Sequence, residues 1–210
     1  MRRRSVTWPG TDADAGDPPR PESCEVDVSP AGLSATGTQR ARTPLPYELR
    51  YEVEAPGHVT RSLLVRVEGD GWSRSLDLRH DGRGGWSWTT TTDGAAGLDP
   101  AGAPPALADG LRTALDCDLG LSPLTNAMPV LRDGLHDGGS RSYVMAWVQV
   151  PDLALVAYPQ RYEHLRRAAS GSVVRFTDLL DPHRFTSDLV YDTDGLVVEY
   201  PGLARRDVVD

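Results

Sequence analysis

Apolar and polar residues alternate along much of this chain, a pattern typical of strands that bury one face. Between residues 45 and 53, Leu, Tyr, Leu, Tyr and Val alternate with proline or charged residues. Successive side chains of a strand point to opposite faces of a sheet, so this period of two predicts one apolar face and one solvent-exposed face. The alternation recurs over 58–68, after an Ala55-Pro56-Gly57 turn that suits a hairpin.

Further strands are predicted where β-branched and aromatic residues gather between turn residues. In the segment over 86–92, Trp86 and Trp88 are two positions apart and therefore project from the same face. A turn over Asp192 to Gly195 predicts a second hairpin between the last two. The predicted segments are 72–78, 86–92, 143–150, 172–176, 185–191 and 196–200.

Helical periodicity is scarce. Leu124, Met128, Leu131 and Leu135 are spaced by four, three and four positions, which places them on one face of a helix. The spacing predicts a helix over about 126–135, with Asn126 as its N-cap and Pro129 in its first turn, where a missing N–H costs no helical hydrogen bond. A weaker pattern over 106–115 predicts a second helix, although Gly110 disfavours it.

Many short strands with one or two helices favour a mainly β fold whose antiparallel sheet curls on itself and encloses an interior. The length of 210 residues suits one domain. Residues 9–22 are rich in Pro, Gly and Asp and contain almost no large apolar side chain. We therefore expect a flexible N-terminal segment over 1–22 and a single domain over 23–210.

Charge and composition narrow the function classes. The net charge is −8 and all 22 basic residues are arginine, which favours a GC-rich bacterial source and disfavours a nucleic-acid partner. The basic start lacks the apolar stretch of an export signal, and no apolar run reaches the ~18 residues of a membrane helix. These features predict a cytoplasmic protein without a transmembrane segment.

Residue patterns of common catalytic and metal sites are missing from the sequence. The five histidines and two cysteines do not form ligand spacings, and the stretch after Asp192 lacks the later ligands of a calcium loop. No GxSxG or phosphate loop is present. The sequence thus predicts a protein that is not an enzyme and uses no metal or cofactor; a hydrolase that uses Asp116 or Asp118 remains an alternative.

Aromatic and amide side chains stand out within polar strands. Such groups suit sugar faces and hydroxyls, which favours a binding site. The alternative is that the tryptophans fill the core and that Asn126 and Gln160 satisfy backbone groups or cap a helix. The residues concerned are Trp72, Trp86, Trp88, Trp147, Tyr143, Tyr158, Tyr162, Asn126 and Gln160.

Residues 122–130, SPLTNAMPV, resemble the TPxTNTLPI motif of a bacterial family known as putative glycolipid-binding proteins. The resemblance extends to Gln160-Arg161-Tyr162 and to residues 192–205, DTDGLVVEYPGLAR, which look like the DxxGLVxxYPxLxxR ending of the family. It runs from about residue 24 to 206. The chain departs from the family where two arginines usually follow the motif, because Leu131 and Arg132 occupy those positions here.

The resemblance implies a spiral β-roll, in which a long, mostly antiparallel sheet wraps around the single helix at 126–135, and it implies homodimers. Our leading hypothesis is a non-catalytic binder of a glycolipid or other amphipathic ligand, held in the groove of the rolled sheet. The alternatives are a homodimeric interaction protein without a ligand and the carboxylate-dependent hydrolase. The predicted ligand-binding residues are Trp86, Trp88, Asn126, Arg132, Gln160 and Tyr162.

Overall fold

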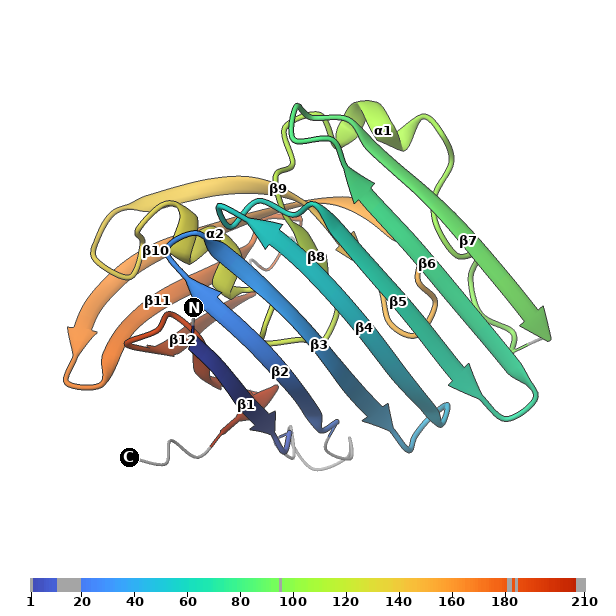
Figure 1. The fold of residues 1–210 in the computed structure, drawn as a ribbon, viewed down its shortest axis with the longest axis horizontal. Coiled ribbons are helices and arrows are strands. Elements are labelled where there is room, and N and C mark those ends of the chain that lie inside the picture. Colours follow the sequence, from blue (N-terminus) through green and yellow to red (C-terminus); the bar gives the residue numbers. More distant parts are fainter. Residues whose placement is uncertain (1, 11–19, 95, 181–182, 184, 207–210) are drawn as a thin grey trace.

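The fold is mainly β, as the alternation predicts, but it contains two sheets where one long sheet was expected. The computed structural model describes residues 2–10, 20–94, 96–180, 183 and 185–206. Each sheet has seven strands: β1–β7 form the N-terminal sheet and β8–β14 form the C-terminal sheet (Figure 1). The chain completes the first sheet before it begins the second.

The N-terminal sheet is an antiparallel meander whose strands follow one another in chain order. In the strand over Tyr47–Pro56, buried residues alternate with exposed ones, as the period of two predicts. The hairpin between it and the next strand is confirmed, with Glu54 opposite Ser62. The strands are β1 (Arg2–Trp8), β2 (Glu22–Ser29), β3 (Gly32–Ala41), β4 (Tyr47–Pro56), β5 (Ser62–Gly69), β6 (Trp72–His80) and β7 (Trp86–Gly94).

The C-terminal sheet is also a meander, antiparallel except for one parallel pair, β8 with β9. It curves around the second helix, so that its inner face is concave (Figure 1). The predicted second hairpin is confirmed, since Val190 lies opposite Glu199. The strands are β8 (Cys117–Leu119), β9 (Ser140–Val148), β10 (Leu155–Ala168), β11 (Gly171–Asp178), β12 (Thr186–Asp192), β13 (Val197–Tyr200) and β14 (Ala204–Arg205).

A short helix lies between the two sheets, at the place where the sequence predicts one. This helix, α2, covers Ala127–Arg132. Ala127 and Met128 pack into the core against the N-terminal sheet, whereas Val130 packs into a second core against the C-terminal sheet. The helix therefore fills the space that the curved sheet leaves open.

The predicted bounds of this helix, 126–135, are wrong at its C-terminal end. Gly134 adopts a positive φ of 65°, a conformation that ends helices, and Leu135 stays buried without being helical. Asn126 has helical dihedral angles and makes no side-chain cap, which corrects its predicted role as the N-cap. The second predicted helix is reduced to α1 (Leu107–Gly110), which ends at the glycine that weakened the prediction.

The expectation of a flexible segment over 1–22 does not hold for Arg2–Trp8. These residues form β1, which pairs with β2 at seven positions from Arg2 opposite Val28 to Trp8 opposite Glu22. Trp8 is fully buried, and its indole N–H donates to the carbonyl oxygen of Val197 in the other sheet at 2.9 Å. Residues 11–19 lie outside the described residues. The early tryptophan thus joins the two sheets.

Replacing Trp8 should therefore cost stability although it lies near the N-terminus. We expect Trp8→Ala to lower the free energy of unfolding by about 3–5 kcal/mol, because it leaves a cavity where the indole is fully buried and removes one of the two hydrogen bonds to the carbonyl oxygen of Val197, which keeps the bond from Arg206. Thr7→Ala, next to it on the exposed face of β1, should change it by less than about 0.5 kcal/mol. Urea unfolding of both variants measures these changes. Equal, small changes in the free energy of unfolding would show that β1 contributes little to stability.

Candidate functional site

Three polar side chains of the loop between β8 and α2 each bond to a different part of the molecule. Ser122 Oγ donates to Glu22 of the N-terminal sheet at 2.8 Å. Thr125 Oγ1 donates to Asp118 at 3.0 Å, and Asn126 Nδ2 donates to the hydroxyl of Tyr162 in the C-terminal sheet at 2.8 Å. The loop therefore links both sheets through buried hydrogen bonds.

Glu22 is a buried carboxyl group at the N-terminal-sheet end of this linkage. Its Oε1 accepts hydrogen bonds from Tyr51 at 2.6 Å and from Ser122, and its Oε2 accepts one from Gln39 at 3.2 Å. Burial raises the pKa of Glu22 to about 7, although the three donors oppose this shift. Near neutral pH the group therefore exchanges between its neutral and charged forms.

A second buried chain of hydrogen bonds lies on the C-terminal-sheet side. Gln160 Nε2 donates to Asp118 at 2.5 Å, and the hydroxyl of Tyr162 donates to Gln160 Oε1 at 3.2 Å. Burial raises the pKa of Asp118 to about 6, and the bonds from Gln160 and Thr125 oppose the shift. Asp118, Gln160, Tyr162 and Asn126 thus form one connected polar cluster, called here the polar floor.

A pocket of about 360 Å³ lies over the polar floor. Strand pairing explains its position: Asp118 lies opposite Trp147, and Gln160 lies opposite Asp178, so these side chains share a face of the C-terminal sheet. We call it the aromatic pocket. It is lined by Asp118, Leu119, Gly120, Leu121, Ser122, Asn126, Trp147, Tyr158, Gln160, Phe176, Asp178, Phe185, Tyr200, Pro201, Gly202 and Leu203.

Aromatic rings form the walls of this pocket. Trp147 and Tyr158 pack against each other with ring centroids 4.6 Å apart, and the Tyr158 hydroxyl donates to Asp178. Phe176 contacts both Phe185 and Tyr200, with centroid distances of 6.3 Å and 6.2 Å. A polar floor between aromatic walls is the usual composition of a small-molecule site.

Of the six predicted ligand-binding residues, three come together here. Asn126 and Gln160 line the aromatic pocket, while Tyr162 is fully buried behind them. The side chains of all three also bond to one another or to Asp118. The amide groups of Asn126 and Gln160 bond to side chains, and not to the backbone groups or helix cap that the alternative interpretation proposed, while both residues also face the pocket.

The other three predicted residues lie elsewhere. Arg132 forms a buried ion pair with Asp116 and lines a different hollow beside Tyr143. The Trp86 indole stacks on His80 and donates to the carbonyl oxygen of Ala114. Trp88 is half-buried and donates to Ala103 at 3.3 Å. None of the three borders the aromatic pocket, because the tryptophans belong to the other sheet and Arg132 is on the far end of α2.

The Arg132 pair bears on the alternative of a carboxylate-dependent hydrolase. Asp116 is buried, and burial raises its pKa to about 6 while Arg132 opposes the shift. Arg132 also donates to the carbonyl oxygen of His58 at 3.3 Å. Of the two candidate aspartates, Asp118 lines the aromatic pocket and Asp116 does not. Asp178 also lines this pocket. The structure therefore separates Asp116 from Asp118 in role: one neutralises an arginine, the other faces a cavity.

The turn between β13 and β14 is the part of the site that sequence reasoning missed. Its residues Tyr200, Pro201, Gly202 and Leu203 form one side of the aromatic pocket. They belong to the ending that resembles the family, as Ser122 and Asn126 belong to its motif. The segments that carry the resemblance, including Gln160, therefore meet at one cavity, and that shared resemblance was the available signal.

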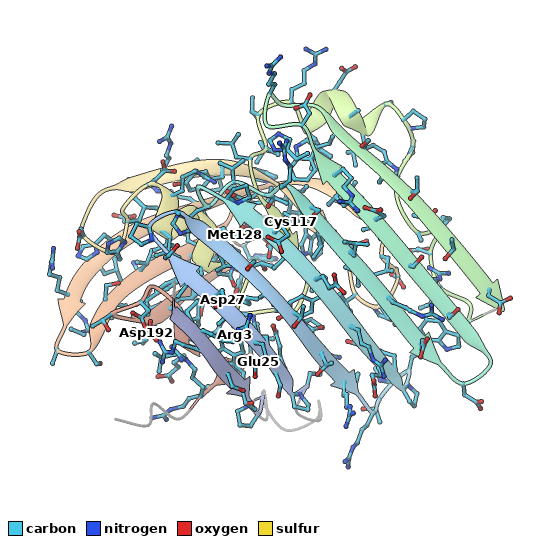
Figure 2. The ribbon with its side chains drawn as sticks, viewed as in Figure 1. Arg3, Glu25, Asp27, Cys117, Met128 and Asp192 are labelled. Atoms are coloured by element: carbon cyan, nitrogen blue, oxygen red, sulfur yellow. The ribbon has the colours of Figure 1, made fainter. Side chains whose placement is uncertain are left out.

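A larger hollow, of about 600 Å³, lies on the outer face of the N-terminal sheet. Strand backbone forms its floor, and Leu64 lies among polar and charged side chains such as Arg50 and Arg66. These arginines pair with Glu48 and Glu68, two positions away on their own strands. Figure 2 shows Arg3, Glu25 and Asp27 on the nearby strands β1 and β2. We favour the aromatic pocket as the site because it combines buried polar side chains with aromatic rings packed against one another, which the hollow on the outer face lacks in the described residues.

Sulfur-containing residues and carboxylates near the sheet interface have structural partners. Cys24 and Cys117 are free and buried. Thr60 Oγ1 contacts the sulfurs of both Cys117 and Met128, which Figure 2 labels between the sheets. Asp192 is bonded by Arg4 and Arg206, so the turn that starts there is closed by ion pairs. Within the described ranges, no cluster of three His, Cys, Asp or Glu residues suits a metal ion.

Comparison with known proteins agrees with the resemblance in the sequence. The profile of the family described as "Putative glycolipid-binding" matches residues 5–206. The chain belongs to this family. A crystal structure of a DUF1089 family protein from Pseudomonas aeruginosa is similar to it, with a TM-score of 0.69, 28% identity, and coverage of 93% of this chain and 97% of that one. Curated proteins gave no match.

One further observation concerns membranes: among the described residues, no helix has the length and apolar character needed to cross a bilayer. The two helices, α1 and α2, contain four and six residues. A helix that spans the hydrocarbon core needs about 20.

The buried carboxyl of Glu22 predicts a pH-dependent stability in this family member. Its folded pKa of about 7 exceeds the ordinary 4.5, so between these values unfolding releases a proton and stability falls as pH rises. We expect this loss to be roughly 2–3 kcal/mol between pH 5 and 8. Glu22→Gln should remove this contribution to the pH dependence of the free energy of unfolding. A smaller decrease with rising pH should remain, because the pKa values of Asp116 and Asp118 are also raised by burial.

The matched control is Glu25→Gln, on the same strand but exposed on its outer face. This variant should show the same dependence of the free energy of unfolding on pH as the wild-type protein. Urea unfolding at pH 5, 6.5 and 8 measures all three proteins. An unchanged slope in the Glu22 variant would mean that this carboxyl is ionised in the folded protein throughout the range.

Proposed function

We propose that this protein is a non-catalytic binder of a glycolipid or similar amphipathic ligand, whose polar head enters the aromatic pocket. The observation that carries the proposal is the convergence, over one cavity of about 360 Å³, of a buried polar floor and aromatic walls. Ligand sites in proteins are mostly apolar clefts of about 300–1,000 Å³ with a few placed polar groups. Membership of the family supports the same ligand class.

The rim of the pocket offers a place for an apolar tail. Leu121, Leu203 and Phe185 line the cavity, and Phe185 is 49% exposed. Leu180, which is 54% exposed, is tied to the cavity because its backbone N–H donates to Asp178 at 2.8 Å. Exposed large apolar side chains beside a pocket often mark a binding surface. In this proposal the acyl chain leaves the pocket across these residues.

The proposed binding mode differs from a ligand that fills the middle of the rolled sheet. That space holds α2 and the buried side chains of Leu124, Met128 and Val130. The aromatic pocket instead uses the part of the concave face next to the start of the helix, where Asn126 lies. The ligand would therefore sit beside the helix on the inner face of the C-terminal sheet.

Two tryptophans test which sheet binds the ligand. The proposal predicts that Trp147→Ala, which removes a wall of the aromatic pocket, lowers the amount of amphiphile that the protein retains by about tenfold or more. Trp88→Ala, a half-buried tryptophan of the N-terminal sheet that does not border the pocket, should bind as the wild type does. Mass spectrometry of lipids eluted after incubation with a bacterial lipid extract measures both.

The reverse result, loss with Trp88→Ala and none with Trp147→Ala, would place the ligand on the N-terminal sheet. If the wild-type protein retains no amphiphile at all, the proposed function is wrong. Circular dichroism and thermal unfolding of each variant separate lost binding from lost folding.

Homodimerisation through a strand edge is a second candidate function, supported by β7. This strand ends the order of the N-terminal sheet, so one of its edges has no partner strand in the described part of the chain. Its exposed run Thr89 to Thr92 contains no charge and no proline. Natural edge strands usually carry charged residues or proline, which prevent pairing with another molecule. An uncharged, β-favouring edge therefore suits pairing with a second copy of this chain.

Light scattering tests this candidate. If β7 pairs with its copy, Thr89→Lys with Thr91→Lys should convert a dimer of about twice 22.8 kDa into a monomer, because lysines meet across the new interface. The control pair Thr36→Lys with Thr38→Lys lies on the interior strand β3 and should stay dimeric. A monomeric wild-type protein would refute the candidate without affecting ligand binding.

A further inference from the structure

The hydrogen bonds of the polar floor all run in one direction. The amide nitrogen of Gln160 donates to Asp118 Oδ2 at 2.5 Å, and the hydroxyl of Tyr162 donates to Gln160 Oε1 at 3.2 Å. Asn126 Nδ2 in turn donates to the hydroxyl oxygen of Tyr162 at 2.8 Å. Each donor of this chain therefore points toward Asp118.

The carboxylate at the end of the chain dictates this direction. An ionised Asp118 only accepts hydrogen bonds, so Gln160 must turn its amide nitrogen toward Asp118 and its carbonyl oxygen toward Tyr162. That oxygen takes the single hydroxyl proton of Tyr162, so Tyr162 can only accept from Asn126. Turning either amide over would place two acceptors face to face in a buried site, because all four residues are at least nine-tenths buried.

The direction also decides which atom of the Asn126 amide meets the aromatic pocket. Asn126 is 4% exposed and borders this pocket, and its Nδ2 is engaged by Tyr162. Its Oδ1 does not cap α2, and no described residue donates a hydrogen bond to it. The described side-chain atoms that are both sealed from solvent and unpaired belong to other residues, so Oδ1 is open to the cavity. A buried amide with an open acceptor at a cavity indicates a donor on the ligand.

The ionisable neighbours of Asp118 leave it as the group that controls the chain. Burial raises the pKa of the nearby thiol and of the nearby tyrosines far above neutrality, so these groups stay uncharged. Asp116 has a pKa of about 6, as Asp118 has, but its carboxyl bonds to Arg132 outside the polar floor. The ionisable groups that interact with Asp118 are Asp116 and Cys117 on its own segment, Tyr162 on β10, Tyr191 on β12 and Tyr200 on β13.

We propose that Asn126 accepts a hydrogen bond from the ligand at its amide oxygen, and that Asp118, Gln160 and Tyr162 are the positioning residues that hold it in this orientation. The proposal rests on the proposed function, since it assumes that an amphiphile enters the aromatic pocket. It adds a requirement on the head group, which must offer a hydroxyl or N–H donor, as a sugar does. A head that only accepts hydrogen bonds leaves Asn126 Oδ1 unpaired.

Two uncharged detergents of equal chain length test this orientation. Octyl β-glucoside carries hydroxyl donors, whereas octyldimethylphosphine oxide carries only an acceptor. Each is titrated into the full chain at pH 8, below its critical micelle concentration, and followed by calorimetry. Tyr162→Phe removes the hydroxyl that holds Nδ2, so either arm of the Asn126 amide can then face the ligand. We expect this variant to bind the phosphine oxide at least about fivefold more tightly than the wild type does, with glucoside binding about unchanged.

The matched control is Tyr191→Phe. Tyr191 is also fully buried, and its hydroxyl donates to the backbone carbonyl oxygen of Asn126 at 3.2 Å. This variant loses a hydroxyl beside the same residue without releasing the side-chain amide, and neither tyrosine borders the pocket. Tyr191→Phe should therefore keep the wild-type ratio of the two affinities.

The unaltered protein provides a second test, which does not depend on the stability of any variant. At pH 5, below its pKa of about 6, Asp118 carries a proton that it can donate to Gln160, so the chain can run either way. The ratio of glucoside affinity to phosphine oxide affinity should therefore fall severalfold from pH 8 to pH 5 in the wild type. It should not change with pH in Tyr162→Phe, where the chain is interrupted.

The outcomes separate this inference from the proposed function. An unchanged ratio in Tyr162→Phe, or an equal change in Tyr191→Phe, overturns the proposed orientation of Asn126 but leaves an amphiphile site in place. A wild-type ratio that is the same at pH 8 and pH 5 overturns the role of Asp118. Binding of neither detergent, together with no lipid retained from an extract, overturns the proposed function itself.

Discussion

The structure depends on the buried hydrogen bonds that the loop before α2 makes to both sheets. Buried polar groups are costly unless they are paired, so Ser122, Thr125 and Asn126 each stabilise the fold only in the arrangement where Glu22, Asp118 and Tyr162 meet them. Among the described residues, no strand of one seven-stranded sheet pairs with a strand of the other, so other contacts must fix their relative position. The loop, the helix that follows it and the bond from Trp8 to Val197 contribute to that connection, together with the ion pair of Arg4 with Asp192 and the bond from Cys117 N–H to Thr60 Oγ1.

The same loop also explains where the candidate site lies. Its polar side chains are satisfied on the side that faces the protein, and the loop and the Tyr200–Leu203 turn leave a cavity between them on the concave face. The amide groups of Asn126 and Gln160 are consequently held by their neighbours, which fixes their orientation at the aromatic pocket. Structural satisfaction and the proposed ligand binding are therefore compatible roles for these residues, because the same arrangement satisfies their hydrogen bonds and places them at the pocket.

Sequence reasoning predicted the elements whose pattern is local. The alternation of apolar residues identified β4 and β5, and the leucine and methionine spacing located α2 to within three residues of its end. It did not predict β3, whose residues Gly32–Ala41 are mostly small or polar, because this strand is held by neighbours on both sides and needs little apolar surface of its own. β10 was also missed, since its polar stretch is interrupted by a bulge between His164 and Arg166.

The amino-acid sequence by itself determined the mainly β class, the place of the helix, the family resemblance and two of the residues that line the pocket, Asn126 and Gln160. Only the tertiary structure decided that there are two sheets, that Trp86, Trp88 and Arg132 lie away from the pocket, and that Asp178 and Tyr200 line it. The reason is physical: a period of two or of 3.6 is set by neighbouring residues, whereas a cavity is formed by side chains from strands far apart in the chain, brought onto one face by strand register and curvature.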